Sequence, residues 1–188
     1  NDRRVAQWLV DAEAPPQSIF QALHDDPTTG EEATVRPIML ALAIDLVITV
    51  QESATLDFLR STAPLTSEER KANRDRLGAE IVGANREDPS DDEELIRILG
   101  WMRKGGTPEL LYQLLALKYQ PSQADFDATL TNIKRLSFIK QRPSDQRLFL
   151  HDEMYDLVQT HALKFADPDR ERVYRHLLAH YAREVQLA

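Results

Sequence analysis

The chain has 188 residues, of which 42% are hydrophobic and 29% are charged, a composition typical of a folded globular protein with a buried core. Its formal net charge of −8 argues against a nucleic-acid partner, because neutralising phosphates needs a surplus of Lys and Arg. The sequence contains no cysteine, which excludes disulfides, thiol catalysis and cysteine-bound zinc and suits a cytoplasmic protein.

Residues 1–88 are predicted to form a helical bundle subdomain. The run from residue 37 to residue 50 is apolar almost all round, which predicts a buried helix, and Pro37 fits its first turn. This run is too short to cross a bilayer and contains Asp45, so no membrane partner is expected. A more polar helix is predicted over residues 67–82, on the surface of the subdomain.

A polar, acidic stretch over residues 83–92 marks the predicted boundary. Three helices are expected after it: one that ends at Gly105-Gly106, one that begins at Thr107-Pro108, and one over about residues 122–136. A β-hairpin follows, with strands at 138–139 and 148–150 around the turn RPSDQ. Three helices followed by a hairpin is the order of a winged-helix domain.

The predicted fold class is therefore mainly α. A helical bundle subdomain, residues 1–88, precedes a winged-helix domain with a short β-hairpin, residues 89–165. Helices are expected from about Asp152 and from Asp167, and residues 166–188 begin a further helical region.

No enzyme motif or metal site is found in the sequence. It lacks the phosphate-binding frame Gly-x4-Gly-Lys-Ser/Thr, the zinc motif His-Glu-x-x-His and the nucleophile motif Gly-x-Ser-x-Gly, so no catalytic residue is predicted. The acidic run Asp91 to Glu94 is interpreted as a helix start, with a cation site as the alternative. His176 and His180 lie one helical turn apart but lack a third metal ligand.

The triplet Leu150-His151-Asp152 falls between a predicted strand and a predicted helix. A histidine at such a junction can donate a ring N–H to a phosphate, while the neighbouring Asp caps the helix. Alternatively, Asp152 only caps the helix and His151 is a partly exposed neighbour. Spacing alone favours this alternative.

The stretch IKRLSFIKQRPSDQRLFLHDEMYDLV resembles the end of the winged-helix part of STAND-class signalling ATPases, the NB-ARC and NACHT group. These proteins close that domain with a Met-His-Asp motif, which Leu150-His151-Asp152 matches with Leu in place of Met. Upstream, Val35-Arg36-Pro37 is similar to the family's Gly-x-Pro element, which precedes a buried helix and lies against the adenine. The resemblance covers about residues 16–165.

This resemblance implies a nucleotide-controlled switch. In the family, the helical and winged-helix subdomains fold back on a P-loop domain, and the motif histidine contacts the β-phosphate of ADP to hold the closed state. Nucleotide contacts are thus implied for His151, Arg36 and Pro37, with Leu150 and Asp152 as supporting residues of the motif.

The cofactor implied by the resemblance is ATP or ADP, held by a larger parent protein. The chain begins with neither Met nor a signal-like segment, so we expect a piece of a longer polypeptide with its P-loop domain before Asn1. Its partners would be that P-loop domain and other protein domains. The 188 residues alone are then expected neither to hydrolyse ATP nor to bind nucleotide tightly.

Two other functions stay open at this stage. A winged-helix DNA-binding regulator would read bases with the third helix, yet that helix carries Asp125 and Asp127 near its start. A small basic patch near the hairpin favours this alternative: Lys134, Arg135, Lys140, Arg142 and Arg147. A helical adaptor would bind another protein through the helix that begins at Asp167.

Overall fold

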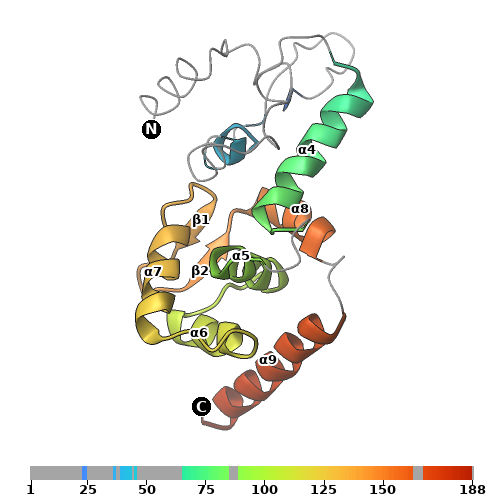
Figure 1. The fold of residues 1–188 in the computed structure, drawn as a ribbon. Coiled ribbons are helices and arrows are strands. Elements are labelled where there is room, and N and C mark those ends of the chain that lie inside the picture. The colour runs from blue at the N-terminus through green and yellow to red at the C-terminus, as the bar shows by residue number, and fades with distance from the viewer. Residues whose placement is uncertain are drawn as a thin grey trace. The chain divides into compact units, whose positions relative to one another are not determined.

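A computed structural model of the protein shows mainly helices and one small antiparallel sheet of two strands (Figure 1). The mainly α fold class with a short hairpin is therefore confirmed. The chain divides into two compact units, residues 1–78 and residues 79–188, while the predicted domain boundaries stay predictions. The structure describes residues 23–24, 36, 39–43, 45, 65–84, 89–162 and 167–187.

The first unit contains part of the predicted buried helix. Residues 39–43 are helical, and Met39, Leu42 and Ala43 are buried there. Pro37 and residues 46–50 lie outside the described residues.

The polar helix α4, Ser67–Ile81, begins as predicted from the sequence. The Thr66 N–H donates to the Glu69 carboxylate at 2.7 Å, and the Thr66 hydroxyl accepts the Glu69 N–H at 3.2 Å. This reciprocal pair satisfies two backbone donors that a helix start leaves unpaired.

The second unit has the predicted order of three helices, a hairpin and two helices. Local signals start the helices: Ser90 and Glu93 form a reciprocal cap on the first, Thr107 caps the second with Pro108 at its first position, and Ser122 caps the third. The acidic run Asp91 to Glu94 forms the first helical turn, as expected. The elements are α5 Asp91–Trp101, α6 Pro108–Ala116, α7 Gln123–Ile133, β1 Ile139–Gln141, β2 Leu148–Leu150, α8 Asp152–Ala162 and α9 Asp167–Leu187.

The two strands pair antiparallel, with Ile139 opposite Leu150. Gly106 adds an isolated bridge to Leu148, with an N–H to O distance of 2.9 Å in each direction. The prediction that Gly105-Gly106 ends the first helix is wrong, because α5 already ends at Trp101 and this segment pairs with β2. Gly105 has φ +65°, and a Cβ there would lie 2.1 Å from the Leu148 carbonyl oxygen, so the approach requires glycine.

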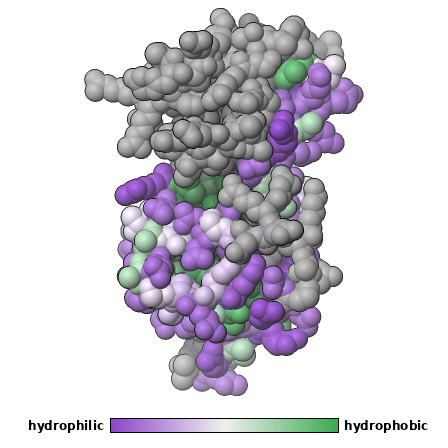
Figure 2. All heavy atoms as spheres, in the orientation of Figure 1, coloured by the Kyte–Doolittle hydropathy of each residue, from purple (hydrophilic) through white to green (hydrophobic). Residues whose placement is uncertain are grey.

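Helix α5 lies at the centre of the second unit, where it contacts α6, α7, α8 and β2 (Figure 1). Its side chains Leu95, Ile98 and Leu99 are fully or almost fully buried, as are Phe126 on α7 and Phe138 before β1. The visible outer face of the described residues is mostly hydrophilic (Figure 2). The core of this unit therefore forms around α5. This core holds the junction between β2 and α8 in place.

Helices α5 and α8 lie close together at Gly100. A Cβ built there would lie 2.4 Å from Cγ1 of Val158. We expect Gly100→Ala to destabilise the protein by about 1 kcal/mol or more, since overpacking typically costs 1–3 kcal/mol and Ala regains up to about 1 kcal/mol of helix propensity. Urea unfolding should detect this loss, and adding Val158→Ala should reduce the effect of Gly100→Ala. If Gly100→Ala destabilises the Val158→Ala variant as much as it destabilises the wild type, the contact between Gly100 and Val158 is contradicted.

Candidate functional site

His151 is the single residue between strand β2 and helix α8. Its backbone N–H donates to the Phe138 carbonyl at 2.8 Å, and its carbonyl accepts the Met154 N–H at 2.8 Å. The first bond ties His151 to the segment before β1, and the second ties it to the first turn of α8. The backbone of the motif is thus fixed on both sides.

The imidazole of His151 has an unusual environment. The residue is partly exposed, but its Nδ1 atom is buried and has no hydrogen-bond partner among the residues that the structure describes. A buried polar atom without a partner costs about 1–3 kcal/mol, so such atoms are rare in stable folds. A ligand cannot reach Nδ1 while this atom is buried, so only the exposed part of the residue can meet one.

The two neighbours of His151 differ in burial. Leu150 is fully buried and anchors the end of β2 in the core. Asp152 is exposed and is the first residue of α8, whereas we expected it at the capping position just before the helix. A carboxylate in the first turn still lies favourably in the field of the helix dipole.

Tyr155 supports this junction and was missed in the sequence. It is 2% exposed, and its hydroxyl lies 3.3 Å from the Met102 carbonyl oxygen and 3.2 Å from that of Arg103. Burial raises the pKa of this hydroxyl, so it is protonated and able to donate at neutral pH. These contacts hold α8 against the end of α5. The sequence offered one signal for its burial, which is its position one residue after Met154 in the same buried helical turn.

The upstream residues of the predicted nucleotide site belong to the other unit. Arg36 is exposed, and its carbonyl accepts the N–H groups of Met39 at 2.9 Å and Leu40 at 3.2 Å, which begins the buried helix. Pro37 lies outside the described residues. The structure therefore brings Leu150, His151 and Asp152 together, and a joint contact of Arg36 and His151 with one nucleotide stays a prediction.

The basic patch near the hairpin is partly neutralised by Asp145. This carboxylate accepts from Arg142 at 2.6 and 2.9 Å and from the Arg147 Nε at 3.2 Å. The hydrogen bond from Arg142 lowers the pKa of Asp145 well below its ordinary value. On α7, Asp125 and Asp127 are exposed, and their negative charges are unfavourable in a helix that reads DNA bases. The contacts of this face thus add nothing in favour of DNA recognition.

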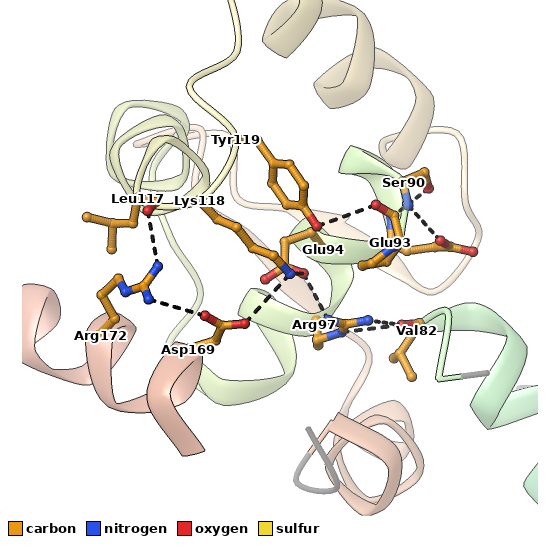
Figure 3. Close-up of polar contacts among 11 residues, drawn as sticks. Val82, Ser90, Glu93, Glu94, Arg97, Leu117, Lys118, Tyr119, Asp169 and Arg172 are labelled. Carbon is orange, nitrogen blue, oxygen red and sulfur yellow. Dashed lines mark hydrogen bonds and ion pairs between the residues drawn. The ribbon is translucent and has the colours of Figure 1, made fainter. Parts of the chain in front are cut away.

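A group of charged side chains makes polar contacts with several parts of the second unit (Figure 3). Arg97 is 3% exposed and donates to the Val82 carbonyl at 2.8 and 3.3 Å and to Glu94 at 3.0 Å. Glu94 is also 3% exposed and lies 3.3 Å from the Lys118 ammonium. Burial lowers the pKa of Arg97, and the Glu94 carboxylate opposes that effect. We name Glu94 and Arg97, together with Lys118 at their exposed edge, the buried charge cluster.

This cluster connects four parts of the unit. Lys118 follows α6 and lies 3.7 Å from Asp169 on α9, while Arg97 reaches the carbonyl at the end of α4. Burial acts to lower the pKa of Lys118, but Tyr119 and Glu94 outweigh it and raise that pKa. Sequence reasoning placed Glu94 only in a helix start; the spacing of three residues to Arg97 was the signal for an ion pair.

The cluster contains no metal site. Within the described ranges, the structure contains no group of three His, Asp or Glu side chains placed to hold a metal ion. Nor, in the same ranges, is any helix long and apolar enough to cross a membrane.

Comparisons with family models, with curated proteins and with solved structures found no match to the chain.

Proposed function

We propose that this chain is the nucleotide-state-sensing regulatory part of a STAND-class signalling ATPase. In this proposal His151 contacts the β-phosphate of ADP and so favours the closed, inactive state. The observation that carries it is the place of the partly exposed His151 directly between β2 and α8, in a triplet resembling the family's Met-His-Asp motif. A ring N–H of a partly exposed histidine can donate to a phosphate oxygen.

The order of elements in the second unit supports a winged-helix arrangement. Helix α5 is followed by the Gly106 bridge, which contributes a minimal third strand, then by α6, α7 and the hairpin β1–β2. In a winged helix, a short strand between the first two helices pairs with the hairpin, as Gly106 does with Leu148. His151 then follows the last strand of the wing, which is where the family motif would stand.

A switch needs contacts that differ between its two states. His151 would supply one such contact, with its backbone fixed by Phe138 and Met154 so that the ring moves with the whole unit. The chemistry of ATP hydrolysis belongs, in this proposal, to a P-loop domain of the parent protein. The 188 residues would sense the product and not form it.

The test is the nucleotide content of the polypeptide that carries this region together with a P-loop domain. After purification without added nucleotide, acid extraction and chromatography should recover stoichiometric ADP from the inactive protein. A polypeptide that lacks a P-loop, or that binds ADP equally well after deletion of residues 89–188, would contradict the proposal.

A further inference from the structure

Helix α9 is attached to the second unit through few buried side chains. Among the described side chains of this 21-residue helix, only Val173 and Leu177 are buried, at 5% and 9% exposed. Helix α8 has only 11 residues, yet it buries Met154, Tyr155 and Val158 almost completely. Because apolar stabilisation grows with the area removed from water, α9 is held to the unit much more weakly than α8.

Two hydrogen bonds join α9 to α6 and its end, beside this apolar pair. Arg172 donates to the Leu117 carbonyl at 3.4 Å, and His176 Nε2 lies 3.2 Å from Gln113 Oε1. The Arg172 side chain is 48% exposed, and Gln113 and His176 are partly exposed. If α9 separates from α6, water can replace the lost partner in each bond, so these bonds add little net stability to the docked position.

The ion pair at the start of α9 has a second partner for each of its charges. Lys118 lies 3.7 Å from Asp169 and also 3.3 Å from Glu94 (Figure 3). Asp169 in turn lies 3.7 Å from Arg172 on its own helix. If α9 separates, Lys118 keeps Glu94, and Glu94 also keeps Arg97 at 3.0 Å. Separation therefore does not leave the buried Glu94 carboxylate unpaired, which would be its largest electrostatic cost.

We propose that α9 is a releasable helix, which separates from α6 by local opening while helices α5 to α8 and the hairpin stay folded. Such openings occur in the least buried parts of a structure, at free energies below that of global unfolding. The opening uncovers Val173 and Leu177 on α9 and Gln113 on α6, so the protein presents a second surface without unfolding its core. The inference does not rest on nucleotide sensing, since it uses only the burial and contacts of α9.

The test is native-state hydrogen exchange of the whole chain, followed by nuclear magnetic resonance at increasing urea concentrations. After correction for intrinsic rates, amides at residues 173–180 of α9 should exchange at least about tenfold faster than those at residues 95–99 of α5. The exchange of α9 should also depend less on urea, because local opening exposes less surface than global unfolding. Equal rates with equal urea dependence in the two helices would overturn the inference.

Leu177→Ala tests the contact through which α9 is attached. It removes a buried side chain and should accelerate exchange of the α9 amides at least about tenfold. Leu178→Ala is the matched control: it makes the same change one residue along, at a side chain 73% exposed, and should leave this rate within about twofold of the wild type. If Leu177→Ala has no more effect than Leu178→Ala, the helix frays without separating from α6 and the inference is refuted.

Val158→Ala distinguishes local opening from global unfolding. Val158 is fully buried on α8, where it packs against Gly100 of α5. This contact is kept when only α9 opens, so the variant should accelerate exchange in α5 at least about tenfold and leave exchange in α9 unchanged. Equal acceleration in both helices would mean that α9 opens only when the whole unit unfolds, which contradicts the inference.

Discussion

Arg97→Met is expected to lower the free energy of unfolding by about 3 kcal/mol, the lower end of the range for breaking a buried ion pair. The substitution leaves the Glu94 carboxylate, 3% exposed, without its nearest cation, and the Val82 carbonyl without a donor from Arg97. Lys118 remains 3.3 Å from Glu94 and limits the loss. Urea unfolding followed by far-ultraviolet circular dichroism measures the change.

Two further variants test whether the expected loss of stability comes from the burial of the ion pair. Arg175→Met removes an exposed pair with Glu171 and should cost less than about 1 kcal/mol. The double variant Glu94→Leu with Arg97→Met should recover part of the loss, since no buried carboxylate is then left without its partner. If Arg97→Met costs no more than Arg175→Met, the buried charge cluster does not hold the unit together.

In the proposed parent polypeptide with a P-loop domain, we expect His151→Ala to accelerate ADP release roughly tenfold to a hundredfold. The estimate follows because a hydrogen bond to a charged group contributes about 1.5–3 kcal/mol, and each 1.4 kcal/mol is a factor of ten. Loss of the closed state should also raise basal signalling. The rate can be followed by displacing a fluorescent ADP analogue with excess unlabelled ADP.

The matched control is His180→Ala, which removes a histidine from α9, the helix that follows α8 in the chain. This variant should release ADP at the wild-type rate. A second variant, Asp152→Val, removes the carboxylate from the first turn of α8 and should weaken ADP retention as well. Unchanged release in both His151→Ala and Asp152→Val would remove the role proposed for the triplet.

The helices and the hairpin of the second unit could be predicted because their signals are local. Thr107 before Pro108 marks a helix start within two residues, and only residues 142–147 separate β1 from β2. The pairing of Gly106 with Leu148 could not be predicted in this way. It joins residues far apart in sequence, and a glycine pair after a helix resembles an ordinary helix end.

The same distinction between local and long-range signals applies to the candidate site. The place of His151 between a strand and a helix was predicted, because both neighbours have clear local patterns. That Nδ1 has no partner among the described residues could not be predicted, because this depends on which side chains the folded unit brings near the ring. Burial of Glu94 and Arg97 is likewise a result of packing, because charged side chains are mostly exposed.

The proposed contact between His151 and ADP can be tested most directly by nuclear magnetic resonance of the ring nitrogens. Histidine would be isotope-labelled in the proposed parent polypeptide with a P-loop domain, and the His151 signals identified by their loss in His151→Ala. We expect these signals to shift when ADP binds and to stay unchanged with adenosine, which has no phosphate. Saturation with ADP without any shift of the His151 signals would contradict the proposed phosphate contact.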